Sequence, residues 1–155
     1  IIGSHSGEIK ALCLSSGAII WKHHLDCRIE SSPVSSSNGS LVFIGGHNGQ
    51  LASIKTSTGE LCWAFQTSDV IKCTPFAGTS AKHGDILLLG THAKMLYCLQ
   101  QSDGKVLWET IVDGNIFSSP FLHQHFTVAA TTKGTVYSYD EEGNQKWRSF
   151  IGSPI

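Results

Sequence analysis

Short apolar runs separated by turn-forming residues recur along the chain. Residues 41–44 read Leu-Val-Phe-Ile and residues 86–89 read Ile-Leu-Leu-Leu; each run ends at a Gly and is followed, a few residues later, by a second apolar stretch. Runs of this length bounded by turn residues are typical of antiparallel strands joined in hairpins. No stretch combines helical apolar spacing with helix caps. The pattern predicts an all-β protein.

The apolar runs belong to a repeated unit that is marked by tryptophan. At four places a Gly is followed four residues later by a Trp, and these pairs use every Trp in the chain: Gly17 and Trp21, Gly59 and Trp63, Gly104 and Trp108, Gly143 and Trp147. Successive Trp residues are separated by 42, 45 and 39 positions. A period of this size is typical of repeat architectures.

Two further markers keep the same order within each unit. The tripeptides Ser31-Ser32-Pro33, Cys73-Thr74-Pro75 and Ser118-Ser119-Pro120 stand twelve residues after a Trp, and a Gly-x-His turn follows at His5, His47 and His92. We expect four strands per unit: one begins near the Pro, two flank the Gly-x-His turn, and one carries the Trp. The units cover about residues 1–30, 31–72, 73–117 and 118–155, and Ser153-Pro154-Ile155 is expected to begin another.

A four-stranded sheet of one unit cannot bury both of its faces alone, whereas sheets packed face to face around an axis can. The sequence therefore predicts a β-propeller of about 3.75 four-stranded antiparallel blades, since the first unit lacks its opening strand. We expect an arc of a larger ring, with closure as a four-bladed ring as the alternative. The repeated Trp suits a wedge between blades, and the Gly before it suits a tight turn. Three extra residues of the third unit, within residues 78–85, are expected to lengthen a turn and leave the strands intact.

The motif Thr/Ser-x-Gly-x-x-x-Trp, combined with Ser-Ser-Pro, resembles the pyrroloquinoline-quinone-type (quinoprotein-like) propeller repeat over essentially the whole chain. The resemblance implies that Trp21, Trp63, Trp108 and Trp147 dock onto neighbouring blades. Lys94 in place of a turn Gly, Cys73-Thr74 in place of Ser-Ser, and the shorter Glu141-Glu142-Gly143 depart from the pattern. The chain is most similar to the C-terminal propeller of the β-alanine-activating enzyme family, acyl-CoA-synthetase-like proteins. That resemblance implies a parent ligase that uses ATP and a phosphopantetheine-bearing carrier domain.

Charge and cysteine content exclude several other classes. Eleven basic and twelve acidic residues give a net charge of −1, whereas nucleic-acid binders usually show a basic face, so we expect no nucleic-acid partner. No apolar run approaches the ~20 residues needed to span a membrane, so no membrane partner is expected. Five cysteines without Cys-x-x-Cys spacing indicate small apolar side chains in a reducing, intracellular and cytoplasmic compartment.

The candidate chemistry is sparse. The chain lacks the adjacent Cys-Cys pair that quinoprotein dehydrogenases carry, and its acidic residues fall mostly at turns, so neither quinone nor calcium is expected. His5, His47 and His92 recur at one position on successive blades, which stand ~10 Å apart. Zinc ligands must lie at ~2.0–2.1 Å from the metal, so we expect a structural role in the turns, with ligand or partner binding as the alternative. No Gly-x-Ser-x-Gly elbow indicates a nucleophile.

These observations favour a non-catalytic propeller that binds a protein, or a substrate presented by neighbouring domains of the same chain. A rigid ring with variable loops is a suitable platform for binding. Two alternatives remain: a structural scaffold like the quinoprotein-like lipoprotein of outer-membrane barrel assembly, and a degenerate quinoprotein dehydrogenase. We expect any function to lie where the repeats differ, at residues 78–85 and at the Gly-x-His turns.

Overall fold

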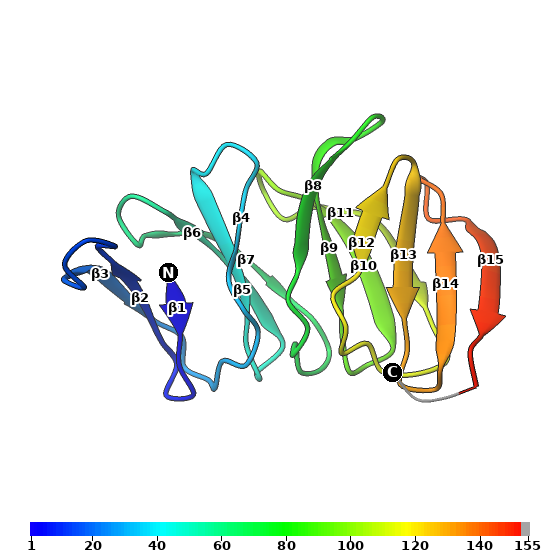
Figure 1. Ribbon diagram of the computed structural model, residues 1–155, viewed down its shortest axis with the longest axis horizontal. Helices are drawn as coiled ribbons and strands as arrows, with labels where there is room; N and C mark the ends of the chain where they lie inside the picture. Colours follow the sequence, from blue (N-terminus) through cyan, green and yellow to red (C-terminus); the bar gives the residue numbers. More distant parts are fainter. Residues whose placement is uncertain (153–155) are drawn as a thin grey trace.

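The computed structural model describes residues 1–152, and its regular structure consists of antiparallel strands. Figure 1 shows four sheets side by side in an open arc, from the first sheet at one end to the fourth at the other. The predicted all-β arc of propeller blades is confirmed. The further unit predicted to begin at Ser153-Pro154-Ile155 lies outside the described residues.

Each sheet is a meander of consecutive strands, with three strands in the first sheet and four in each of the others. The missing strand is the innermost strand of the first sheet, as the sequence predicted. The strands are β1 (Ile2–Gly3), β2 (Glu8–Leu12) and β3 (Ile19–His24); β4 (Val34–Ser35), β5 (Leu41–Gly45), β6 (Gln50–Lys55) and β7 (Leu61–Gln66); β8 (Phe76–Ser80), β9 (Gly84–Gly90), β10 (Met95–Gln100) and β11 (Val106–Ile111); β12 (Phe121–His123), β13 (Phe126–Ala130), β14 (Thr135–Tyr139) and β15 (Gln145–Phe150).

The tripeptides before the innermost strands anchor the incoming chain to the next strand. Ser31 Oγ donates a hydrogen bond to the Gly45 carbonyl (2.9 Å) and accepts one from the Gly45 N–H (2.8 Å). Cys73 Sγ donates to the Gly90 carbonyl (3.1 Å) in the next sheet. A small side chain with a donor hydrogen is therefore what this position requires, which explains why Cys can replace Ser there.

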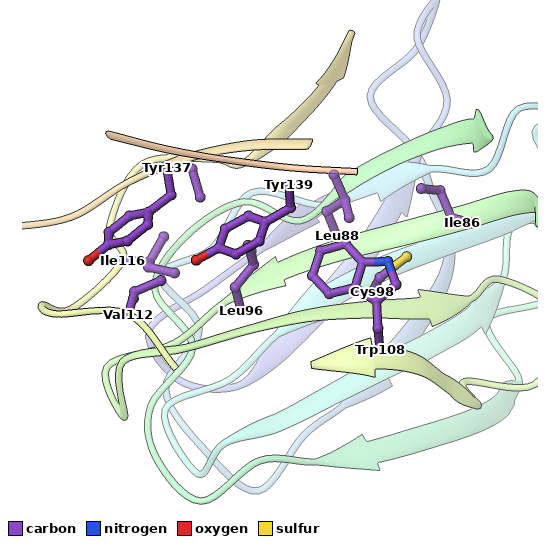
Figure 2. Packing of buried hydrophobic residues seen from close by; sticks show 10 residues of the cluster. Ile86, Leu88, Leu96, Cys98, Trp108, Val112, Ile116, Tyr137 and Tyr139 are labelled. Carbon is purple, nitrogen blue, oxygen red and sulfur yellow. The ribbon is translucent and has the colours of Figure 1, made fainter. Parts of the chain in front are cut away.

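Three apolar clusters fill the spaces between successive sheets. Strand β10 shows how both faces of an inner sheet are used: Leu96 and Cys98 face the fourth sheet, while Tyr97 and Leu99 face the second. Side chains alternate between the faces of a strand, so a strand that is buried on both faces is apolar throughout. In Figure 2, the rings of Tyr137 and Tyr139 on β14 lie over the third sheet; they stack with their centroids 6.0 Å apart.

The extra residues of the third unit lengthen strands rather than a turn, contrary to the sequence prediction. Strand β8 has five residues, compared with two in β4, and it pairs with β9 from Phe76–Leu88 to Ser80–Gly84. The extended hairpin can hydrogen-bond along its whole length, and it projects beyond the neighbouring sheets (Figure 1). Strands β8 and β9 together have five more residues than β4 and β5, and the turn between them has two fewer (residues 81–83 compared with 36–40), which accounts for the three extra residues.

Candidate functional site

The four predicted Gly-Trp motifs meet in three Trp–Gly contacts across the joints between sheets. The ring of each Trp lies against the Gly of the next sheet, so that a Cβ added at that Gly would lie 2.7 Å from Trp21 (at Gly59), 2.7 Å from Trp63 (at Gly104) or 2.8 Å from Trp108 (at Gly143). The three glycines also have positive φ angles of 79°, 73° and 82°. Glycine is thus required both by the backbone conformation and by the space that the indole fills.

Two of the indoles are also hydrogen-bonded across the joint. Trp21 Nε1 donates to the Thr56 carbonyl (2.8 Å), and Trp63 Nε1 donates to the Gln101 carbonyl (3.0 Å). Each acceptor stands three residues before the Gly that the ring covers. A buried indole N–H needs a partner, so this bond fixes the orientation of the ring on the turn.

Within residues 1–152, the two motif halves at the ends of the arc contact no second half. Gly17 has a φ of +70° and no atom within 4 Å of a Cβ added to it. Trp147 is 48% exposed, whereas Trp21 is 8% and Trp108 9% exposed. Each motif therefore serves two different joints: its Trp packs on the Gly of the next sheet, and its Gly is covered by the Trp of the preceding sheet.

A second recurrent contact joins each of the first three sheets to the loop that follows it, and it was not predicted from the sequence. Ile29, Ile71 and Ile116, each eight residues after a Trp, pack on the glycines that end the second strand; a Cβ on Gly3 would lie 2.7 Å from Ile29. All three Ile side chains are almost completely buried. The fixed spacing of eight residues from Trp to Ile could have indicated this contact. A search for catalytic or metal-binding residue types does not detect it, because Ile is neither.

The Gly-x-His turns lie at one end of the blades, beside the loops that connect successive sheets. The backbone N–H of His47 donates to the Arg28 carbonyl (2.9 Å), and the N–H of His92 donates to the Val70 carbonyl (3.1 Å). Thr132 makes the same bond to Asn115 (2.9 Å) in the fourth sheet. Because Thr makes it as well, the recurrent bond needs the backbone and leaves the side chain free for other contacts.

The side chain of His47 belongs to a charged network with the preceding loop. His47 Nε2 lies 2.8 Å and Lys72 Nζ 3.4 Å from Glu30 Oε2, and Arg28 Nη2 lies 2.6 Å from Glu30 Oε1. The close approach of His47 Nε2, together with the neighbouring Arg28 charge and against the effect of burial, holds the pKa of Glu30 below its ordinary value. One carboxylate therefore organises three cationic or potentially cationic side chains at this surface.

His92 has a different environment, which is aromatic. Its ring lies edge to face with Phe117 at a centroid distance of 4.3 Å, and Lys72 Nζ lies 5.9 Å from the Phe117 centroid. Burial and the Lys72 charge lower the pKa of His92. The Nε2 atom of His92 is buried and has no hydrogen-bond partner in the described part of the chain.

His5 borders an open cleft of about 660 Å³ beside the unpaired edge of β1, which Arg28 and Glu30 also line. His5 and His47 thus both lie near Glu30, whereas His92 lies against Phe117. Within residues 1–152, no three His, Cys, Asp or Glu side chains are grouped as metal ligands would be. The histidines share the position of the turn. The loops beside them differ at the residue nine positions after each Trp, which is Glu30, Lys72 or Phe117.

The extended β8–β9 hairpin makes a clamp onto the fourth sheet. Ser80 Oγ donates to Glu141 Oε1 (2.6 Å), His83 Nε2 lies 3.0 Å from the Glu141 carbonyl oxygen, and Lys82 forms an ion pair with Glu142. The hydrogen bond from Ser80 holds the pKa of Glu141 below its ordinary value. Residues 78–85, expected to be a place for function, therefore reinforce the joint at which Trp108 covers Gly143.

Comparison with known proteins gives a consistent assignment. The family described as the β-propeller of the β-alanine-activating enzyme matches residues 1–155. A β-alanine-activating enzyme of Danio rerio is 54% identical over 41 residues, which are 26% of this chain and 4% of that protein. In the described residues, no helix is long and apolar enough to cross a membrane.

Solved structures show the same fold over less than half of their own length. BamB from Moraxella catarrhalis has a TM-score of 0.80 and 19% identity, covering 97% of this chain and 45% of that chain. The computationally designed Ika8 protein has a TM-score of 0.84 and 15% identity, covering 99% of this chain and 46% of that chain. The resemblance seen in the repeat motifs is confirmed: the chain belongs to the β-propeller family of the β-alanine-activating enzyme.

Proposed function

We propose that this chain is a non-catalytic interaction module of an ATP-dependent β-alanine-activating enzyme, and that it binds neighbouring domains of that enzyme through the Gly-x-His end of its blades. The observation that carries the proposal is that the backbone hydrogen bonds at this end recur from sheet to sheet, whereas the side chains beside them differ. The backbone bonds of His47, His92 and Thr132 recur, whereas Glu30, Lys72 and Phe117 are acidic, basic and aromatic at one equivalent position.

Such an arrangement suits recognition better than catalysis. Loops on a rigid scaffold carry binding residues with little ordering on contact, and Arg and aromatic side chains are enriched at protein interfaces. Arg28, Lys72 and Phe117 place basic and aromatic side chains at one surface. Glu30 forms ion pairs with Arg28 and Lys72 there. The five cysteines are unpaired thiols, which supports a reducing cytoplasmic compartment.

The test is a titration of the isotope-labelled chain with a β-alanine-activating enzyme from which the propeller has been removed. We expect NMR shift changes to concentrate at residues 28–30, 70–72 and 115–117. Exchanging Lys72→Glu together with Phe117→Ala should weaken binding by about tenfold or more, corresponding to ~1.4 kcal/mol. The matched control is Lys105→Glu, an exposed charge at the opposite end of the blades, which should leave the affinity unchanged.

Saturating enzyme without any shift change would contradict the proposal, as would an equal loss of affinity in Lys105→Glu. The catalytic assignment has a separate test. The 155-residue chain alone should give no β-alanine-dependent exchange of pyrophosphate into ATP, and a measurable exchange rate abolished by a single substitution in this chain would overturn the non-catalytic role.

A further inference from the structure

The joint between the third and fourth sheets contains a cleft of about 410 Å³ beside the outer strand β15, lined by Asp113, Thr135, Arg148 and Phe150. The acidic residue comes from the loop after β11, the threonine begins β14, and the other two lie on β15. Val112, which precedes the acidic residue, packs in the same cluster as Tyr137 of β14 (Figure 2). The volume is within the range of about 300–1,000 Å³ that is usual for small-ligand sites.

The β15 residues of this cleft face the third sheet and not the end of the arc. Arg148 pairs in register with Tyr137, and Phe150 pairs with Thr135; directly paired residues lie on the same face of a sheet. Tyr137 packs against the third sheet. Ile111, the equivalent of Phe150, is 75% exposed although a further sheet follows it. The 71% exposure of Phe150 is therefore a property of the outer strand.

Asp113 supplies a negative charge that is fixed in place. Its Oδ1 accepts a hydrogen bond from Thr131 Oγ1 (2.8 Å), and its Oδ2 accepts one from Thr135 Oγ1 (2.6 Å). Against the effect of burial, these bonds and the charge of Lys133 hold the pKa of Asp113 below its ordinary value. Each oxygen of an ionised carboxylate can accept more than one hydrogen bond, so Asp113 can accept a further donor.

Arg148 supplies the opposite charge. Its guanidinium makes no ion pair or side-chain hydrogen bond within residues 1–152, whereas the guanidinium of Arg28 is paired with Glu30. A guanidinium has five N–H donors in a planar fork that matches a carboxylate. Phe150 adds an exposed apolar ring on the same strand. The cleft thus combines a donor group, a fixed acceptor that does not pair with it, and an apolar wall.

The corresponding positions in the other joints lack this combination. They hold Asp26, Gln50, Ala64 and Gln66 between the first and second sheets, and Ser68, Met95, Glu109 and Ile111 between the second and third. Among the joints between the described sheets, the third is thus distinguished by an acidic, a basic and an aromatic side chain at these positions. Because the other two joints form without this set, the packing of sheets does not require it.

We propose that this cleft binds a free amino acid with an apolar side chain. Its carboxylate pairs with Arg148, its ammonium group donates to Asp113, and its side chain packs on Phe150. A ligand with both charges satisfies both side chains, whereas a simple anion is repelled by Asp113 and a simple cation by Arg148. The proposal needs no contact with neighbouring domains, so it is independent of the function proposed above.

The test is an NMR titration of the isotope-labelled 155-residue chain with phenylalanine and two matched analogues. N-acetylphenylalanine lacks the ammonium group, and phenylalaninamide lacks the carboxylate. We expect saturable shift changes at residues 113, 135 and 148–150 with phenylalanine, with millimolar affinity. Each analogue should bind about tenfold more weakly or worse, because one buried charge then loses its charge-assisted hydrogen bond.

Arg148→Gln keeps a polar side chain at an exposed position, so its spectrum should remain that of the folded chain. It should weaken phenylalanine binding by about tenfold or more, and it should make phenylalanine and phenylalaninamide bind equally. Lys22→Gln is the matched control, because Lys22 is an exposed cation at the equivalent position of the first sheet, and it should leave binding unchanged.

Three results would overturn the proposal. The first is the absence of saturable shift changes at the cleft with phenylalanine. The second is equal binding of phenylalanine and N-acetylphenylalanine, which would show a site for carboxylates in general, such as the end of a peptide chain. The third is phenylalanine binding that Arg148→Gln leaves unchanged.

Discussion

Trp63 in the second repeat and Trp147 in the fourth occupy the same repeat position, yet they have opposite surroundings. Trp63 lies on Gly104 and donates to the Gln101 carbonyl, whereas Trp147 is 48% exposed at the end of the arc. The same difference separates Gly59, covered by Trp21, from Gly17, covered by nothing. The Trp and the Gly of one contact therefore come from two different repeats. How much either residue contributes to the free energy of unfolding depends on whether a neighbouring sheet supplies the other.

The largest expected difference is between Trp63→Ala and Trp147→Ala. Removing a docked aromatic side chain should lower the free energy of unfolding by about 3–5 kcal/mol, because the indole leaves a cavity and the Gln101 carbonyl loses its donor. Removing the exposed Trp147 should lower it by less than about 1 kcal/mol. Urea melts at low protein concentration measure both. Equal losses would show that the Trp acts within its own sheet instead of at the joint.

The second comparison separates the backbone requirement for Gly from the steric one. Gly59→Asn and Gly17→Asn impose a similar left-handed conformation, since φ is +79° and +70°, but only Gly59 faces an indole. We expect a loss of about 1–3 kcal/mol at Gly59 from overpacking, and a loss of no more than about 1 kcal/mol at Gly17. Thermal or denaturant melts that give the same loss at both sites would contradict the role of Trp21.

A smaller effect is expected where the third sheet departs from the repeat. Lys94 has a φ of +61°, at the position where Gly7, Gly49 and Gly134 have φ between 79° and 84°. Lys94→Gly should relieve about 1 kcal/mol of backbone strain, in part offset by the greater freedom of Gly in the unfolded chain. The expected net gain is about 0.5 kcal/mol in denaturant melts. A net loss of stability would show that the Lys94 side chain contributes a contact of its own.

The smallest effect concerns the clamp that, among the joints between the described sheets, distinguishes the third joint. Its carboxylate, Glu141, has a pKa below the ordinary 4.5 because Ser80 donates to it. The folded state therefore holds its proton less tightly than the unfolded state. The clamp contributes stability above the ordinary pKa and loses it as the pH falls through the folded value. Glu141→Gln should thus flatten the fall in stability below about pH 5.

Urea melts at a series of pH values measure this slope. Glu109→Gln, an exposed carboxylate on β11, is the matched control and should leave the slope as in the wild type. If Glu141→Gln also leaves it unchanged, the hairpin at residues 78–85 does not couple the third sheet to the fourth.

The repeat markers were enough to predict the strands, the missing first strand and the arc. They could do so because turn residues and Trp recur at fixed distances, and local spacing reflects local hydrogen bonding. The partner of each Trp could not be predicted, because Trp21 and Gly59 lie 38 residues apart and meet only when two sheets pack. The packing of Ile71 on Gly45 was hidden as well, because these residues lie 26 positions apart and meet only when the loop after β7 folds back on its own sheet.

The charged and aromatic surroundings of the histidines were equally hidden. The sequence shows that His47 and His92 recur. Glu30, however, reaches His47 from the loop before its sheet, whereas Phe117 reaches His92 from the loop after its sheet. The sequence located the extra residues correctly, within residues 78–85, but predicted a turn where the structure has strand. The Gly, Thr and Ser residues of this segment read as a turn, while pairing with β9 and contact with Glu141 make it strand.

The most direct test of the joint is hydrogen exchange of the four indole Nε1–H groups, followed by NMR in dilute solution. The Trp21 and Trp63 indoles donate to Thr56 and Gln101, so they should exchange far more slowly than Trp147, at rates set by opening of the joints. The Trp147 indole should exchange at nearly the rate of an unprotected one. A Trp147 indole as slow as that of Trp63, or a Trp63 indole as fast as that of Trp147, would contradict docking between sheets.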